Sequence, residues 1–374
     1  MGALQAIVKR IVASQDKRTS RKLLAFVSDD WGCLRIRSKQ DREALLKAGF
    51  NLDANRFDKF DSLETNEDIE HLFEVISRFR DSNGNHFVIT AVSNMGNPDY
   101  EAISKSGFES YHYKTVVQSW NDQQSSSRVY SLILDGIKSG IFIPEFHGRE
   151  HLFVSYWMKL LKSNDPVVKK AFENGYYMLG KEALKSNYLY GLGAAFDYFD
   201  NSDLETRSQI IHDGLRIFNE SFHYNSSYFT APALIYNEGL NFDLHNSGIK
   251  WIDVSRNRRM PVGNGKYVRK FHHLGQMNKF NQRYVTRNCV FEPNHSNPEN
   301  SVASCLKDIQ IAFENKRPAI ISNHRVAFVG GLYEKNRISG LNALELLLKS
   351  ILSNWPDVEF CSVPALMNKL VECR

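Results

Sequence analysis

The sequence lacks an apolar run of the roughly 20 residues that a membrane-spanning helix needs, which excludes an integral helical membrane protein. Its first residues also lack the apolar centre and the small-residue cleavage site of a secretory signal, so we expect a cytoplasmic protein. The five cysteines are scattered and never spaced as Cys-x-x-Cys, which disfavours a disulfide framework and a thiolate metal site. No internal repeat or low-complexity stretch stands out.

The apolar content is sufficient for a large core. In 374 residues, 42% are hydrophobic and 12% aromatic, which excludes a disordered chain. We expect one elaborated domain over residues 22–370, preceded by a basic amphipathic helix within residues 1–21. Apolar side chains recur at helical spacing over residues 4–12. Such a helix can pack on its own domain or lie on an anionic membrane surface, and both interpretations stay open.

Positive charge is concentrated in two segments. Between Val254 and Phe291 there are nine Lys and Arg residues and no Asp or Glu, and residues 1–22 carry a net charge of +5. Since the whole chain carries +5, the remainder carries −9. Such segments can face an anionic ligand or form solvated loops. We expect no nucleic-acid partner, because aromatic residues are not interleaved with the basic segment as a base-stacking surface requires.

Short apolar runs alternate with segments of helical spacing, which predicts an α/β protein with a parallel sheet. Strand-length runs occur at residues 22–28, 86–92, 140–146, 229–236, 249–254, 319–322 and 358–363. Helical spacing occurs at residues 65–80, 203–222, 301–314 and 339–352. Ser202 and Glu205 have the spacing of a capping box, which predicts a helix start there. Residues 152–200 interrupt the alternation, and we expect them to form a helical insertion.

Two adjacent carboxylates, Asp29 and Asp30, follow the first predicted strand. Carboxyl ends of parallel strands are where α/β folds build their sites. Adjacent side chains of a strand point to opposite faces, so one carboxylate could serve a metal and the other a water molecule. The alternative is a loop pair that caps a helix.

Two further polar clusters follow other predicted strands. His147 and His151 have the spacing that places both imidazoles on one face of a helical turn, close enough to hold one cation. Two imidazoles and a carboxylate form the open, three-ligand set of a catalytic zinc or a similar ion. His324 ends a later apolar run, where an imidazole could protonate a leaving group, with a structural histidine as the alternative.

In order and type, these residues resemble the motifs of the polysaccharide deacetylase family, carbohydrate esterase family four. That family has an Asp-Asp pair after its first strand, then an H-x-x-x-H motif, a proline at a strand end, and a late histidine. The matching residues here are Asp29-Asp30, His147 and His151, Pro232, and His324. The resemblance spans about residues 22–370 and implies a distorted (β/α) barrel, here with about seven parallel strands and the helical insertion.

The resemblance also implies roles. Asp29 would be the general base and His324 the general acid, while one divalent ion would be held by Asp30, His147 and His151. Zinc is the first expectation for this ion, with cobalt, nickel and iron as alternatives. Substrate contacts are expected from Trp31, Arg149, Pro232 and Arg325, although Trp31 could instead fill the barrel.

The chain departs from the family at the third motif. An arginine that pairs with the catalytic aspartate usually precedes the proline there, whereas this chain has Phe229, Thr230 and Ala231. Arg149 or Arg325 could take that place, since each neighbours a predicted site residue. Glu150, Asp253, Glu292 and His295 also lie near strand ends, and the sequence assigns them no role.

The sequence therefore predicts a metal-dependent hydrolase that removes N-acetyl groups from a glycan or glycan precursor. A sugar linked to a nucleotide or a lipid diphosphate would suit the basic segment from Arg256 to Arg287, because phosphates favour clusters of arginine and lysine. The alternatives are an O-acetyl esterase on the same metal site and a glycan-binding barrel without activity. The oligomeric state stays open.

Overall fold

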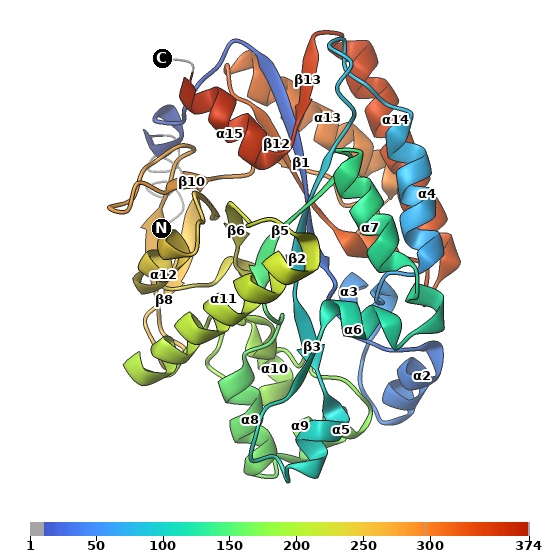
Figure 1. The fold of residues 1–374 in the computed structure, drawn as a ribbon, viewed down its shortest axis with the longest axis vertical. Helices are drawn as coiled ribbons and strands as arrows, with labels where there is room; N and C mark the ends of the chain where they lie inside the picture. The colour runs from blue at the N-terminus through green and yellow to red at the C-terminus, as the bar shows by residue number, and fades with distance from the viewer. Residues whose placement is uncertain (1–10, 296, 373–374) are drawn as a thin grey trace.

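A computed structural model describes residues 11–295 and 297–372 as an α/β protein whose curled parallel sheet forms an open half-barrel (Figure 1). The strands follow the order β10-β7-β6-β5-β2-β1-β12-β11, and β13 pairs with residues 22–25 of β1. Their bounds are β1 (Lys22–Trp31), β2 (Ile89–Asn94), β5 (Phe142–Gly148), β6 (Tyr228–Thr230), β7 (Trp251–Asp253), β10 (Arg283–Val285), β11 (Cys289–Val290), β12 (Ala319–His324) and β13 (Val358–Cys361). The expected distorted barrel is confirmed.

Each of the seven predicted apolar runs overlaps a strand of this sheet. The sequence missed β10 and β11, which are too short to show a period and lie in the basic segment. These two strands are the opposite ends of the strand order, yet only residues 286–288 separate them along the chain. Residues 286–288 therefore span the open side of the half-barrel, from one edge strand to the other.

Alternation along the strands separates two apolar layers. In β1, Leu24 and Phe26 belong to the core between the sheet and its outer helices. Leu23 and Val27 face the other way and pack with α15 (Val363–Glu372) in a separate cluster. Polar residues instead occupy the carboxyl ends of the strands, so the sheet is polar at that end.

Long helices cover the outer side of the sheet (Figure 1). They are α4 (Asn66–Ser77), α7 (Val129–Lys138), α11 (Asn201–Phe222), α13 (Pro298–Glu314) and α14 (Glu334–Asn354), with the short α12 (Asn241–Asn246) beside α11. Thr65 and Asp68 form a capping box at the start of α4. The capping box predicted at Ser202 is wrong: Asp200 caps α11 by accepting hydrogen bonds from the N–H groups of residues 202 and 203.

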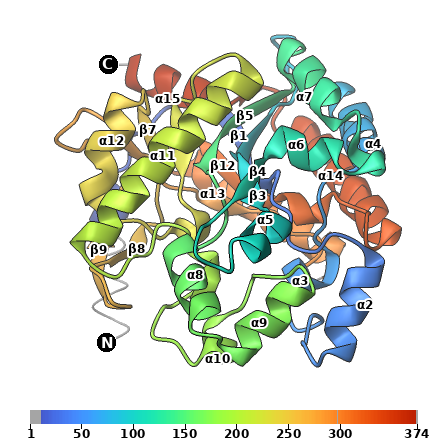
Figure 2. The same cartoon turned by 60° about the horizontal axis from the view of Figure 1, so that its bottom comes forward.

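Short helices and loops form a layer at the carboxyl ends of the strands (Figure 2). A second apolar cluster lies within this layer. Trp157 lies at 0% exposure within it, and Leu45 and Ile103 contribute from other segments. The surrounding elements are α2 (Lys39–Lys47), α3 (Arg56–Phe60), β3 (Gly96–Pro98), α5 (Tyr100–Lys105), β4 (Tyr113–Thr115), α6 (Val116–Asn121), α8 (Val154–Lys162), α9 (Pro166–Glu173) and α10 (Lys181–Leu184). Residues 152–200 thus contain helices as expected, while the single domain over residues 22–370 stays a prediction.

The basic segment contains an antiparallel hairpin of β8 (Asn257–Pro261) and β9 (Tyr267–Phe271). The helix expected over residues 4–12 lies outside the described residues, apart from Ile11 and Val12. Within residues 11–295 and 297–372, no helix has both the length and the apolar character needed to cross a membrane.

Candidate metal centre and catalytic site

A cavity of roughly 680 Å³ opens at the carboxyl ends of β1, β5, β6, β7 and β12. This volume is within the range of small-molecule sites. Five of the residues selected from the sequence line it together, although they come from three strands and one loop: Asp29, Asp30, His147, His151 and His324.

The backbone of β1 turns both adjacent carboxylates toward this cavity. Asp30 has a left-handed φ of 72°, and the register of β1 against β2 shifts between Ser28 and Trp31. The expected alternation is therefore broken, and Asp29 and Asp30 line the same cavity. Gly32 continues the turn with a φ of 75°, where a Cβ would lie 2.5 Å from Cγ2 of Val116. Only glycine fits this turn without displacing its neighbours.

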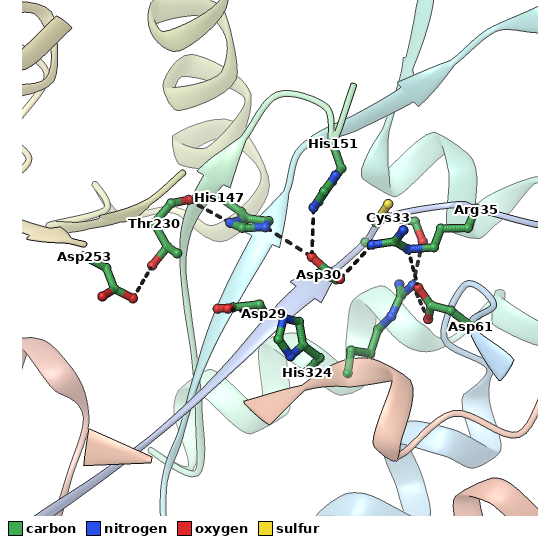
Figure 3. Close-up of polar contacts among 12 residues, drawn as sticks. Asp29, Asp30, Cys33, Arg35, Asp61, His147, His151, Thr230, Asp253 and His324 are labelled. Carbon is green, nitrogen blue, oxygen red and sulfur yellow. Dashed lines mark hydrogen bonds and ion pairs between the residues drawn. The ribbon is translucent and has the colours of Figure 1, made fainter. Parts of the chain in front are cut away.

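The two histidines approach Asp30 from different sides (Figure 3). Nε2 of His147 lies 3.2 Å from Oδ1 of Asp30, and Nε2 of His151 lies 3.3 Å from the same oxygen. All three side chains are buried, and their ligand atoms lie within 4.8 Å of one another. The predicted helical turn is wrong, because His147 belongs to β5 and His151 to the following loop. Gly148, with a φ of 140°, bends the chain between them.

The hydrogen bonds around His147 fit a bound cation. Its Nδ1 lies 2.7 Å from the backbone oxygen of Thr230, which can only accept, so Nδ1 carries the proton. In the neutral imidazole, Nε2 then presents a lone pair to the carboxylate of Asp30, and these two groups repel unless a cation lies between them. Burial lowers the pKa of His151, which favours the neutral form that binds metals.

Arg35 supports the carboxylate from the opposite side. Its Nη2 lies 2.9 Å from Oδ2 of Asp30, which leaves Oδ1 facing the histidines. Burial acts to raise the pKa of Asp30, but the neighbouring His151 and Arg35 outweigh it and hold that pKa well below its usual range. Asp30 is therefore an ionised carboxylate with a fixed orientation.

Behind Arg35 lies a buried ion-pair network. Arg35 also binds Asp61 at 2.9 Å, and Asp61 accepts from Arg325 at 2.7 Å. Arg325 reaches Glu64 at 2.8 Å and has no exposed surface. Arg325 therefore supports the loop behind Asp30, and it is not part of the cavity wall.

The arginine partner of Asp29 is Arg287, which follows β10. Its two terminal nitrogens lie 2.7 and 2.8 Å from the two oxygens of Asp29. Arg287 also binds Asp253 at 2.6 Å. Burial acts to raise the pKa of Asp29, but Arg287 outweighs it and lowers that pKa. Arg287 thus pairs with Asp29 although the third motif contains no arginine. Neither Arg149 nor Arg325 contacts Asp29.

His324 faces Asp29 from β12. Its Nε2 lies 3.9 Å from Oδ2 of Asp29, and its Nδ1 lies 2.5 Å from Oε1 of Glu292. Burial acts to lower the pKa of His324, but the carboxylate of Glu292 outweighs it and raises that pKa. Arg56 binds the other oxygen of Glu292. The sequence assigned no role to Glu292, because nothing in its local pattern indicates this contact.

The other residues expected to contact substrate lie elsewhere. Trp31 is 2% exposed and packs edge-on against Phe142 in the core, 4.8 Å between ring centroids. Arg149 pairs with Glu150 and Asp213 at 2.5 and 2.9 Å. Pro232 is buried at the start of a turn. In the described part of the chain, none of these three residues lines the cavity.

Compared by sequence, the chain matches no protein-family model and no curated protein. Compared by structure, it is similar to a putative glycoside hydrolase/deacetylase from Parabacteroides distasonis, with 7% identity over 95% of this chain and 72% of the other, at a TM-score of 0.50. A probable polysaccharide deacetylase from Pseudomonas aeruginosa PAO1 matches with 11% identity, coverage of 95% and 93%, and a TM-score of 0.48. A putative polysaccharide deacetylase from Mycobacterium smegmatis matches with 12% identity, coverage of 96% and 92%, and a TM-score of 0.44.

These structural neighbours are polysaccharide deacetylases and a glycoside hydrolase/deacetylase at low identity. The resemblance drawn from the sequence motifs is confirmed as a likeness of fold to the Parabacteroides structure, and a divergent member of that fold fits the chain. The chain thus combines a deacetylase-like fold with a buried Asp/His/His group that could hold a divalent metal.

Proposed function

We propose that this chain is a metal-dependent hydrolase that removes an N-acetyl group from a glycan or a glycan precursor. One observation carries the proposal: the buried Asp30, His147 and His151 cluster shares its cavity with a carboxylate and an imidazole that have separate charged partners. The partners are Arg287 for Asp29 and Glu292 for His324. This arrangement supplies a proton acceptor and a proton donor beside one metal site.

Asp30, His147 and His151 would hold the ion, which we propose to be zinc, with cobalt, nickel or iron as alternatives. Bound there, a divalent ion lowers the pKa of a water molecule and polarises an acetyl carbonyl. Asp29 accepts a proton at its carboxylate, because Arg287 keeps it ionised. His324 presents Nε2 to the cavity while Glu292 holds Nδ1, so a proton at Nε2 can pass to a departing group.

The His324–Glu292 pair favours an amide over an ester as the bond that is cleaved. An amine leaves only when it is protonated, whereas an alcohol leaves more readily without a strong acid. The carboxylate of Glu292 raises the pKa of His324 against the effect of burial, which favours the protonated imidazole that can donate to a leaving amine. The experiment must separate N-deacetylation from two alternatives. These are an O-acetyl ester as the substrate and a glycan-binding barrel without activity.

The test combines metal analysis with acetate release. We expect about one equivalent of a divalent metal in the parent protein and little in D30N and H147Q, whereas H71Q, at an exposed histidine outside the site, should keep the metal. The loaded parent should release acetate from N-acetylated sugars in preference to O-acetylated ones. A parent protein that recruits no metal would falsify the proposal, and metal binding without acetate release would favour a glycan-binding protein.

We expect the reaction to take place in the cytoplasm, with any membrane contact made through residues 4–12. There the substrate would be a precursor rather than a finished polysaccharide.

A further inference from the structure

A second hollow of roughly 300 Å³ adjoins the catalytic cavity on the side of the β8–β9 hairpin. The two hollows share Tyr190, Ala233, Leu234 and Ser255 as wall residues. Asn257 and Arg259 of β8 line the second hollow. A groove therefore leads from the candidate metal site to the hairpin, and a ligand that fills the first hollow can extend into the second.

The register of the hairpin places two arginines together on this side. Arg259 is paired directly with Arg269, so both side chains lie on the same face of the hairpin. Both residues are exposed, and no carboxylate among residues 11–295 and 297–372 forms an ion pair with either of them. Like charges directly opposite each other destabilise an antiparallel pair. The hairpin thus maintains an uncompensated positive charge beside the groove.

The other arginines of the basic segment are engaged elsewhere, and Arg283 donates to the backbone oxygen of Gly275 at 2.9 Å. Arg256 pairs with Asp16 at 2.9 Å, and Arg287 is bound to Asp29. Arg258 is fully buried over the ring of Tyr236. Among the arginines of the segment, Arg259 and Arg269 are therefore the two that remain available to an anionic ligand.

An aromatic ring lies between the two hollows. Tyr190 is 48% exposed and belongs to the walls of both. A half-exposed ring next to a polar cavity offers a flat apolar surface for a sugar, with its hydroxyl in water. The groove thus offers, in order, the candidate metal site, a flat ring and a pair of guanidinium groups.

We propose that Arg259 and Arg269 bind a phosphate group of the substrate, so that the acetylated sugar in the cavity is linked to a phosphate or a diphosphate. Guanidinium groups match phosphate oxygens with paired, charge-assisted hydrogen bonds. A bound phosphate would also remove the repulsion between the two arginines. This inference rests on the proposed function and specifies its substrate class.

Binding is measured by titration calorimetry on the metal-loaded protein with matched probes. The probes are N-acetylglucosamine, its 1-phosphate, its uridine diphosphate ester, its short-chain prenyl diphosphate ester and inorganic phosphate. We expect the phosphorylated sugars to bind at least about tenfold more tightly than the neutral sugar, with a preference that weakens as salt increases. The two diphosphate esters show whether a nucleotide or a lipid is the carrier.

R259Q/R269Q should abolish this preference and leave the affinity for the neutral sugar unchanged. K279Q, which removes an exposed charge of the same basic segment outside both hollows, should keep the preference. Equal affinities for neutral and phosphorylated sugars, a preference that survives R259Q/R269Q, or no binding of any phosphorylated sugar would each overturn the inference.

Acetate release separates this inference from the proposed function. Tight binding of the phosphorylated sugars, lost in R259Q/R269Q but without acetate release, would support the anion site and reject the hydrolase. Acetate release from neutral sugars with no preference for phosphate would support the hydrolase and reject the anion site.

Discussion

Arg287 holds both oxygens of the Asp29 carboxylate, at 2.7 and 2.8 Å, although the two residues are 258 positions apart in the sequence. Arg287 lies in the short connection between the two edge strands of the sheet, and it also binds Asp253. This one side chain therefore balances two buried carboxylates at the candidate site.

Replacing Arg287 should shift the acidic limb of the pH–rate profile. In the proposed mechanism Asp29 acts as a base only when ionised, so activity should fall as the pH drops through its pKa, which Arg287 lowers. In R287Q that pKa rises, and we expect activity to fail at a pH about one unit higher. R287K, which keeps the charge, should shift less. An unchanged profile in R287Q with normal metal content would contradict the role given to Arg287.

Replacing Glu292 or Arg56 should shift the basic limb of the pH–rate profile. Activity that needs protonated His324 is lost as the pH rises through its pKa, which Glu292 raises. E292Q lowers that pKa, so we expect the loss about one pH unit earlier. R56Q removes the arginine that competes with His324 for the charge of Glu292. The pKa of His324 should then rise, and the loss of activity should move to higher pH. Shifts of the same sign in the two variants would show that Glu292 does not act through charge.

The buried network behind Asp30 should matter for stability. R325M leaves the buried Glu64 without its guanidinium partner and leaves Asp61 paired with Arg35 alone, and we expect the free energy of unfolding to fall by about 3–5 kcal/mol. The pKa of Asp61 is raised by burial even in the parent, and it should rise further in R325M. Protonation then relieves the buried charge, so the deficit should shrink as the pH falls. Denaturant unfolding at pH 5 and pH 8 measures this, and D61N/R325M should recover part of the loss.

Gly32 and Gly49 form a matched pair for testing the turn after Asp30. Both have positive φ, but a Cβ at Gly49 meets nothing within 4 Å, whereas at Gly32 it would lie 2.7 Å from the backbone oxygen of Asn94. We expect G49A to cost about 1 kcal/mol of stability through its backbone conformation alone. G32A should cost about 1–3 kcal/mol more through overpacking and should also weaken metal binding. Equal costs in thermal or denaturant unfolding would show that the contact relaxes freely.

The sequence predicted the fold and the metal cluster because both depend on local patterns. An apolar run followed by Asp29-Asp30 indicates a strand end directly, and strand ends of a parallel sheet converge. The same reasoning could not show that Asp30 adopts a left-handed φ, nor that His151 lies in a loop. Spacing indicates which side chains are near in the chain, whereas the backbone path between them depends on tertiary packing.

The charged partners could not be predicted because they are distant along the chain. Arg287 lies in a segment without acids, and such a segment is usually a solvated surface. Glu292 and His324 meet across 32 positions, with only short strands and loops around Glu292 to indicate its direction. Trp31 was open to two interpretations, and its place in the core follows from packing against Phe142.

The three residues that join β10 to β11 link the shape of the barrel to its acid–base chemistry. These strands form no ladder with each other in the described strand order, so the gap between them is held by the peptide chain and by the side chain at its centre. The side chain of Arg287 at its centre holds the Asp29 carboxylate at 2.7 and 2.8 Å, so this connection is bound directly to the end of β1. Because Arg287 lowers the pKa of Asp29, the protonation of this carboxylate depends on the position of the connection that closes the sheet.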